Sequence, residues 1–244
     1  MKMSHPIITT PLAHRGLHTA VWDENSLLAF ENAIKKGFGI ELDVHLMKDG
    51  NIAVIHDSSL KRVTGFDVEI ESLSVKDLNK YPLLLSKTFV PTLDDVLKIV
   101  EGRVPILIEL KVVHDFNPIF AEKILEILAQ YPFKKNIALQ SFNPYAVKFL
   151  KKEQDIYPVG QLGSDELPGQ SKFVHFMFKH LFILHVSKPD FLNFDIKYIK
   201  KKKIARLRRR GLPILAWTID SQEKKTLAAS FADNIIFENI NIQR

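Results

Sequence analysis

Cysteine is absent from the 244-residue chain, which excludes disulfide bonds and thiolate metal sites. Long apolar runs are also missing: the longest, at 173–186, is interrupted by Lys179 and three histidines, so it cannot cross a bilayer. No apolar core of a signal peptide precedes His14, and we therefore expect a cytoplasmic protein. A glycine-rich G-x-G-x-x-G phosphate loop is missing too, which argues against a doubly wound dinucleotide fold.

Positive charge is in modest excess, with 34 Lys and Arg against 28 Asp and Glu and a net charge of +6. Much of the excess lies in the segment 197–210, which reads KYIKKKKIARLRRR. This segment is either the solvated face of an outer helix or a patch for anions, and we expect at most weak contact with a membrane surface through it. No nucleic-acid partner is expected, and the oligomeric state is not indicated.

Short apolar or β-branched runs alternate with helical patterns, which is typical of a parallel sheet covered by helices. Eight such strands close a barrel, and 244 residues suit one α/β domain of the (β/α)₈ (TIM barrel) class, spanning 1–244. The expected strands are 9–13, 39–44, 105–110, 136–141, 157–161, 190–194, 213–218 and 234–238. The expected helices are 27–36, 93–101, 196–210, 222–232, two that begin at Pro118 and Pro144, and one near 166–183. An eighth outer helix after the last strand is expected to be absent or vestigial.

The segment 44–90 breaks this alternation and is predicted to be an insertion after the second strand, a hairpin followed by a lid over the barrel mouth. Asp49-Gly50 between two alternating runs favours a two-residue turn. That turn would place Asp43 opposite His56, so the chain would return to the barrel mouth at His56. A plain surface hairpin is the alternative for this segment taken alone.

Ionisable residues are concentrated at the carboxyl ends of the first three predicted strands and at the end of the hairpin. Glu41 and Asp43 share one face of their strand because alternate residues do, and Glu109 and Lys111 share a face of the next. Chemistry in (β/α) barrels is found at this rim. The expected rim residues are His14, Arg15, Glu41, Asp43, His56, Glu109 and Lys111.

Three neighbouring carboxylates repel one another unless a cation joins them. Oxygen ligands from Glu41, Asp43 and Glu109 suit one divalent cation, Mg²⁺ or Ca²⁺, better than zinc. Two alternatives remain open: a structural ion pair between Glu109 and Lys111, and a solvated strand end at Glu41 and Asp43.

The remaining rim residues fit a phosphate group and proton transfer. Arg15 offers a bidentate fork and Lys111 a mobile point charge, while His14 and His56 can exchange protons near neutral pH. Hydrolysis of a phosphodiester needs charge stabilisation at the phosphoryl oxygens and protonation of the departing alkoxide. The residues therefore predict a metal-dependent phosphodiesterase that uses acid/base catalysis.

Eight motifs resemble the glycerophosphodiester phosphodiesterase family in order and spacing. They are AHRG (13–16), ENSLLAF (24–30), GIELDVHLMKDG (39–50), IHD (55–57), PTLDDVL (91–97), LIELK (107–111), QSF (140–142) and AWTID (216–220). The resemblance implies a TIM barrel with a small insertion after the second strand, a place in lipid and glycerol metabolism, and cleavage of glycerophosphodiesters to glycerol 3-phosphate and an alcohol. It leaves open whether the glycerol hydroxyl attacks first, giving a cyclic phosphate, or water attacks directly.

The resemblance also implies roles for individual residues. His14 and His56 would be the catalytic pair, Glu41, Asp43 and Glu109 the metal ligands, and Arg15 and Lys111 the phosphate contacts. Trp217 and Phe142 would line the glycerol or alcohol side, with core packing as their alternative.

Two positions depart from the family pattern: Asp23 replaces a frequent proline, and His45 replaces a neutral polar residue. We expect Asp23 to change only its loop, and His45 to be a solvated hairpin residue unless it contacts the lid. Two other functions are considered: a phospholipase, D-like or phosphoinositide-specific, whose segment 173–210 faces a membrane, and a non-catalytic anion-binding protein that uses residues 200–210.

Overall fold

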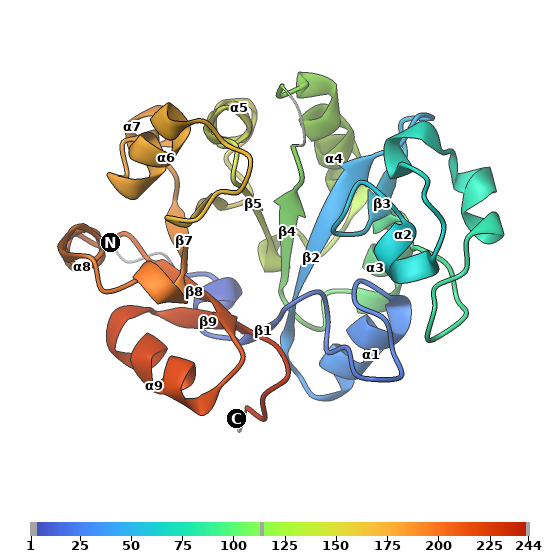
Figure 1. Ribbon diagram of the computed structural model, residues 1–244, viewed down its shortest axis with the longest axis horizontal. Coiled ribbons are helices and arrows are strands. Elements are labelled where there is room, and N and C mark those ends of the chain that lie inside the picture. The colour runs from blue at the N-terminus through green and yellow to red at the C-terminus, as the bar shows by residue number, and fades with distance from the viewer. Residues whose placement is uncertain (1–3, 113–114, 243–244) are drawn as a thin grey trace.

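Eight parallel strands, found in the described residues 4–112 and 115–242 of this computed structural model, close into a barrel surrounded by helices (Figure 1). The ring runs β1-β9-β8-β7-β6-β5-β4-β2, and the β1–β2 pairing closes it. The strands are β1 Leu12–Ala13, β2 Gly39–Leu46, β4 Ile106–Leu110, β5 Ile137–Ser141, β6 Val159–Gly163, β7 Phe191–Asp195, β8 Ile214–Ile219 and β9 Asn234–Phe237. The predicted TIM-barrel fold is confirmed.

Two strands differ from their predicted ranges because of prolines. β1 has only two residues, because the chain before it forms a 3₁₀ helix, η1 (Pro6–Ile8), and Pro11 has no N–H to donate. β6 begins at Val159, directly after Pro158, rather than at residue 157. The predicted strands 9–13 and 157–161 therefore each begin before the observed strand does.

The helices are α1 Leu27–Lys35, α2 Lys61–Thr64, α3 Leu93–Val100, α4 Pro118–Gln130, α5 Pro144–Glu153, α6 Lys172–Lys179, α7 Ile183–Ser187, α8 Lys202–Arg209 and α9 Gln222–Phe231. A capping box of Thr92 and Asp95 begins α3. The predicted helix 196–210 is interrupted, since a 3₁₀ turn (η5, Ile196–Tyr198) precedes α8. The stretch 166–183 contains α6 and the start of α7, separated at Leu181, whose φ is 57°. No helix follows β9 in the part described, which ends at Ile242.

Inward-facing residues change from apolar to polar along the barrel axis. Near the amino ends of the strands an apolar cluster contains Leu12, Leu107, Ala138, Phe191 and Leu215. Two residues further along four of these five strands the positions are Glu109, Gln140, Asn193 and Trp217. The barrel interior is therefore a packed core at one end and a polar site at the other.

The inserted segment begins as a hairpin of β2 with β3 (Ile52–Val54) and continues through α2 and two 3₁₀ helices, η2 (Ile70–Ser72) and η3 (Val75–Lys80). Its own apolar cluster includes Ile55, Leu60, Ile70 and Leu78. This second cluster keeps the segment packed against the side of the barrel, at the right of Figure 1.

The predicted register of the hairpin is wrong by one residue. Val44 pairs with Val54, and the N–H of Ile55 donates to the carbonyl of Asp43 (2.9 Å), so Asp43 lies opposite Ile55 and not His56. The turn contains three residues, with Gly50 at φ 82°, because a type I turn closed by a left-handed glycine also fits the Asp-Gly signal.

Within the described residues, no helix has both the length and the apolar character needed to span a bilayer. Met1–Met3, part of the segment before His14 in which no signal-peptide core was found, and Gln243–Arg244 lie outside the described residues.

Candidate active site

A cavity of about 200 Å³ opens at the carboxyl ends of the barrel strands. Its walls contain eight of the nine predicted site residues together with residues that sequence reasoning gave no role. Asp43, the ninth, is 1% exposed and forms ion pairs with two of the lining residues. The lining residues are His14, Arg15, Glu41, His56, Glu109, Lys111, Gln140, Phe142, Leu162, Asn193, Trp217, Thr218 and Ile236. The structure thus brings all the predicted residues together.

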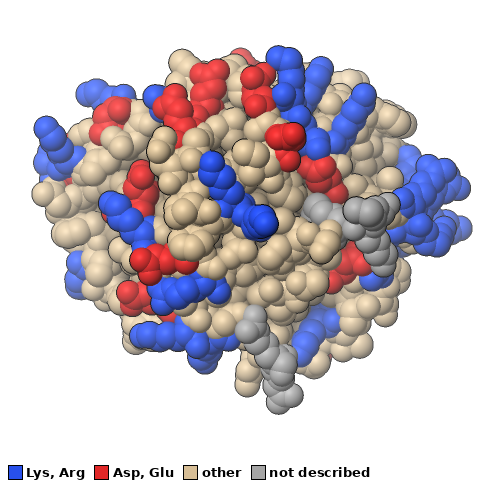
Figure 2. Space-filling view, turned by 180° about the vertical axis from the view of Figure 1, so that it is seen from behind, with Lys and Arg blue, Asp and Glu red and all other residues tan. Residues whose placement is uncertain are grey.

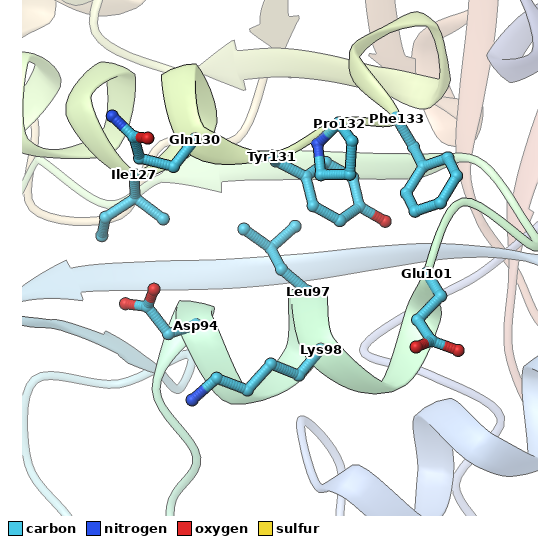
Figure 3. A pocket seen from close by; sticks show the side chains of 9 residues that line it. All are labelled: Asp94, Leu97, Lys98, Glu101, Ile127, Gln130, Tyr131, Pro132 and Phe133. Atoms are coloured by element: carbon cyan, nitrogen blue, oxygen red, sulfur yellow. The ribbon is translucent and has the colours of Figure 1, made fainter.

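A larger hollow of about 350 Å³ lies between α3 and the end of α4 (Figure 3). Tyr131, Phe133 and Leu97 form much of its wall, and none of the predicted site residues lines it. The smaller cavity in the barrel, where histidines, carboxylates, an arginine and a lysine gather, is therefore the candidate active site.

Three carboxylates meet at the floor of the strand ends. One oxygen each of Glu41, Asp43 and Glu109 lies within 4.8 Å of the other two, and all three side chains are buried. The barrel register explains this meeting, because Asp43 of β2 lies beside Glu109 of β4 and Glu41 shares the inward face of β2.

Two cations partly balance these carboxylates. Lys111 Nζ lies 2.6 Å from Glu109 Oε1 and 3.0 Å from Asp43 Oδ1, and Arg15 Nε lies 3.3 Å from Asp43 Oδ2. The backbone N–H of Arg15 donates to Glu41 Oε2 (3.2 Å). Three ionised carboxylates against one lysine and one arginine leave a buried excess of one negative charge.

The pKa values of the three carboxyl groups move apart as a result. Burial raises the pKa of Glu41 well above its ordinary value, and the charges of Asp43 and Glu109 raise it further. Burial also raises the pKa of Glu109. For Asp43 burial acts in the same direction, but Lys111 is among the positive neighbours that together outweigh it and hold the pKa well below normal.

This arrangement fits a divalent cation. Asp43 Oδ1 is buried and makes no hydrogen bond of good geometry, although Lys111 Nζ lies 3.0 Å away. An oxygen-only donor set with uncompensated negative charge matches the ligands that Mg²⁺ and Ca²⁺ prefer. Glu41, Asp43 and Glu109 could hold such an ion, and its charge would remove the excess.

His14 carries a carboxylate partner from the far end of the chain. Its Nδ1 lies 2.7 Å from Glu238 Oε2, and its backbone N–H donates to Phe237 at the end of β9. Hydrogen bonds from His14 and then His18 hold the pKa of Glu238 well below its ordinary value. Because Glu238 occupies Nδ1, Nε2 of His14 is the nitrogen left for proton exchange in the cavity.

His56 has a similar partner in its neighbour. Its Nδ1 lies 2.6 Å from Asp57 Oδ1, and Asp57 Oδ2 accepts from Arg62 Nε (2.6 Å). Arg62 also donates two hydrogen bonds of 2.8 Å to Glu24, which accepts from Arg15 as well. Burial, and then the positive charge of Lys111, lower the pKa of His56 to about 4. The imidazole of His56 is therefore neutral at physiological pH.

The expectation that His45 is a solvated hairpin residue is wrong, since its side chain is 2% exposed. Its Nδ1 lies 2.7 Å from Glu71 Oε1 in the inserted segment, and its Nε2 lies 3.1 Å from the backbone oxygen of His56. The contact with the segment that was the alternative is therefore present. The ring of His45 thus supports the return of the chain at His56.

Asp23 does more than alter its own loop. The buried carboxylate accepts hydrogen bonds from the backbone N–H groups of Leu85 and Ser86 (3.2 and 2.8 Å) and from the Ser86 hydroxyl (2.7 Å). It thus ties the end of the inserted segment to the loop after β1. No local sequence pattern indicates this partner, which lies more than sixty residues away.

Aromatic rings form the apolar wall of the cavity. Phe142 and Trp217 pack edge to face with centroids 5.7 Å apart, and Phe142 also lies 6.4 Å from Phe178 of α6. The Nε1 of Trp217 is buried without a hydrogen-bond partner among the described residues. Both predicted rings line the cavity rather than lying wholly in the core.

Sequence reasoning assigned no role to several residues that hold the site. Gln140 Nε2 donates to Glu41 Oε1 (3.3 Å), and Asn193 Nδ2 donates to Gln140 Oε1 (2.8 Å). Asn25, at φ 53°, donates to Asp43 Oδ2 (2.9 Å). Gln140 could have been found from its place at a strand end, two residues after an inward-facing position.

Comparison with known proteins finds a family model that matches nearly the whole chain. The model of the glycerophosphoryl diester phosphodiesterase family matches residues 14–242. A glycerophosphodiester phosphodiesterase of Caldanaerobacter subterraneus subsp. tengcongensis is 28% identical over 223 residues, which cover 88% of this chain and 87% of the relative.

Solved structures give the same result for the fold. A glycerophosphodiester phosphodiesterase from Thermotoga maritima superposes with a TM-score of 0.74 at 28% identity, covering 96% of this chain and 95% of the other. An Oleispira antarctica phosphodiesterase, solved in complex with the product sn-glycerol-3-phosphate, superposes with a TM-score of 0.79 at 21% identity, covering 93% and 91%.

Proposed function

Because the chain belongs to the glycerophosphoryl diester phosphodiesterase family, and is therefore a phosphoric diester hydrolase, we propose that it hydrolyses glycerophosphodiesters to glycerol 3-phosphate and an alcohol with the help of one divalent cation. The observation that carries this proposal is the meeting of three buried carboxylates within 4.8 Å in a cavity that two histidines line. The bound product of the Oleispira antarctica phosphodiesterase supports the same substrate class.

Glu41, Asp43 and Glu109 hold the cation, which when bound supplies positive charge to the phosphoryl oxygens. Arg15 and Lys111 contribute further positive charge on the same side of the cavity. Lys111 exchanges part of its contact with Asp43 and Glu109 for the phosphate, since one ammonium group can donate three hydrogen bonds. Mg²⁺ and Ca²⁺ both suit an all-oxygen site.

The two histidines divide the proton transfer. His56, neutral because its pKa is lowered to about 4, accepts the proton of the attacking hydroxyl, from water or from the glycerol moiety. His14, whose Nδ1 lies 2.7 Å from the Glu238 carboxylate, gives a proton from Nε2 to the departing alkoxide. The P–O bond to the leaving alcohol breaks as the new P–O bond forms, and one proton moves from the attacking to the leaving oxygen.

Phe142 and Trp217 line the glycerol or alcohol side in this proposal, while residues 1–244 act as one barrel domain with 44–90 as its inserted lid. A cytoplasmic site of action in lipid and glycerol metabolism is part of the same proposal. Family membership argues against the alternative of a non-catalytic anion-binding protein.

Release of glycerol 3-phosphate from glycerophosphocholine tests the proposal directly. Dialysis against EDTA is expected to abolish release, and Mg²⁺ or Ca²⁺ to restore it. Asp43→Asn removes one charge from the ligand set. Asp67→Asn, on the exposed part of the insertion, removes the same charge outside the site and is the matched control. Full activity after chelation would refute the metal dependence, and no activity with any divalent cation would refute the substrate class.

A second candidate function is hydrolysis of lysophospholipids by a phospholipase D-type reaction at a membrane surface. The exposure of Phe173 and Phe176 on α6, close to the barrel mouth, favours it. Turnover of lysophospholipid vesicles without turnover of the soluble diester would select this second function.

A further inference from the structure

We infer that the outer faces of α6, α7 and α8 form a docking surface for an anionic lipid bilayer. We call this surface the aromatic–basic face and define it by Phe173, Phe176, Phe182, Lys202, Lys203 and Arg206. Docking of this kind goes beyond the hydrolysis of a soluble diester and does not depend on the proposed function. A gain in turnover of lipid substrates on docking would depend on the proposed function.

The aromatic half of the face is an exposed stripe on α6. Phe173, Phe176 and His180 follow the i, i+3, i+7 spacing of one helix face, whereas Phe178 is buried on the other. Phe173 is 70% exposed and Phe176 is 50% exposed. Large apolar side chains that gather on one exposed face, rather than being scattered singly, mark an interaction site.

The stripe continues as a packed row of rings into α7. Phe176 lies 4.6 Å from His180 and 5.7 Å from Phe182, and Phe182 lies 6.4 Å from His185. Phe182 is itself 38% exposed. These contacts pack the rings of Phe176, His180, Phe182 and His185 against one another, which lowers the side-chain entropy that binding would remove.

The basic half of the face is joined to the rings by direct contacts. Lys203 Nζ lies 5.0 Å from the Phe182 ring centroid and donates to the His180 carbonyl (2.9 Å), while Lys201 donates to the Lys179 carbonyl (2.9 Å). α8 carries Lys and Arg along its outer side, and Figure 2 shows blue side chains gathered at the edge where α8 lies, at the right of that view.

The charges on α8 are available to a partner. Among the described residues no carboxylate forms an ion pair with Lys202, Lys203, Arg206 or Arg209, whereas Arg208 pairs with Asp233 on the inner side. Exposed aromatic rings beside unpaired cations match an interface of acyl chains and anionic headgroups, in which rings enter the apolar boundary and Lys and Arg meet the negative surface. That charge complementarity selects an anionic bilayer rather than a second, equally basic copy of this chain.

The face also lies beside the entrance of the active site. Phe178, on the inner side of α6, packs 6.4 Å from Phe142, which lines the cavity. A bilayer on the outer side of α6 would therefore lie one helix away from the cavity, where the loop after β6 leaves the barrel.

Cosedimentation of the full chain with vesicles tests the inference. Vesicles of phosphatidylglycerol and phosphatidylcholine are expected to bind the protein, vesicles of phosphatidylcholine alone to bind it far more weakly, and high salt to weaken binding. Phe173→Ser/Phe176→Ser should lower partitioning at least ~10-fold. Phe89→Ser/Phe133→Ser, two exposed rings (45% and 44%) outside the face, is the control and should change little.

Charge reversal tests the basic half. Lys202→Glu/Arg206→Glu should weaken binding by at least ~25-fold, since each Lys or Arg near an anionic surface contributes about fivefold. Lys98→Glu/Lys135→Glu, on α3 and the 3₁₀ turn before β5 and so outside the aromatic–basic face, is the control for net charge. All four double variants should keep the parent rate on soluble glycerophosphocholine, which also shows that they fold.

Three results would overturn the inference. The first is no binding of the parent to anionic vesicles, and the second is equal loss in a variant and its control. The third is a concentration-dependent dimer of the parent that Phe173→Ser/Phe176→Ser dissociates. Such a dimer would assign the face to a second copy of this chain. Vesicle binding by a parent with no diesterase activity would refute the proposed function and leave the docking surface intact, and the converse result would do the opposite.

Discussion

Binding of a divalent cation to the metal-free protein should release a proton, and the affinity should rise with pH. The reason is the charge balance of the site, because among the described residues the Lys and Arg side chains that contact Glu41, Asp43 and Glu109 are Lys111 and Arg15. The excess negative charge is buried, so one carboxyl group keeps its proton until a cation replaces it. Glu41 is that group, because burial and its acidic neighbours raise its pKa well above normal.

The magnitude follows from proton linkage. Below the raised pKa of Glu41 the apparent dissociation constant should fall about tenfold for each unit of pH, or about 1.4 kcal/mol, and above it the constant should become independent of pH. A free cation concentration of about 100 times that constant should stabilise the fold by about 2.7 kcal/mol.

The sign of the stability change without cation is opposite to that of a normal acid. An acid whose folded pKa is raised stabilises the protein while protonated, and this contribution is lost as pH rises through the folded value. Burial raises the pKa of both Glu41 and Glu109, so the metal-free protein should lose stability from these groups as pH increases above their ordinary range. Added Mg²⁺ or Ca²⁺ should reverse that loss.

Titration calorimetry of the chelator-treated protein measures both quantities. Experiments at several pH values between about 5 and 8, each in two buffers of different ionisation enthalpy, give the affinity and the number of protons released. Glu109→Gln should weaken binding of the cation at least ~10²-fold. Glu166 forms an exposed ion pair with Lys197, and Glu166→Gln should change neither the affinity nor the number of protons released. A constant affinity with no proton release across this range would refute the assignment of a shared, charge-deficient site.

The remaining predictions concern the histidines and their supports. His14→Ala and His56→Ala should each lower kcat by at least ~10²-fold on glycerophosphocholine, and a loss below tenfold would mean that the residue is misassigned. Because the pKa of His56 is lowered to about 4 in the fold and is near 6.5 when unfolded, the unfolded chain binds more protons between these values. The contribution of His56 to stability in urea should therefore increase with pH across that window, so the parent should gain stability relative to His56→Gln as pH rises. Arg62→Ala should lower kcat by ~10-fold because Asp57 loses the partner that orients it. The same substitution should cost no more than about 1 kcal/mol of stability, since Arg62 is 48% exposed. Lys61→Ala should leave kcat and stability unchanged, and equal effects of the two substitutions would contradict the role of Arg62.

The barrel could be predicted because its signals are local and repeat. Each buried strand is a short apolar run, and several helices begin at caps such as Thr92 and Asn143 that the structure contains. The carboxylate cluster followed from the same logic, since inward-facing residues of adjacent parallel strands must meet at one rim. That is why Glu41, Asp43 and Glu109 could be grouped without any knowledge of their distances.

Details that depend on the count of residues in a turn, or on contacts distant in sequence, could not be predicted. Asp49-Gly50 is compatible with turns of two or three residues, and the two choices differ by one residue in register. The partner of His14 is Glu238, 224 residues away, and the pair forms only when β9 closes the ring beside β1. No local pattern marks a contact that barrel closure creates.

The inserted segment shows why a wrong register did not displace the candidate site. Strand pairing with Asp43 does not position His56. The imidazole of His45 contacts the backbone oxygen of His56. The carboxylate of Asp57 fixes Nδ1 of His56, and Arg62 bridges Asp57 to Glu24 on the barrel. These polar contacts arise from different segments and act on one residue, so a shift in one hairpin hydrogen bond is a small perturbation. The position of His56 is therefore set by the junction of insertion and barrel, and residues of that junction should affect proton transfer before they affect substrate affinity.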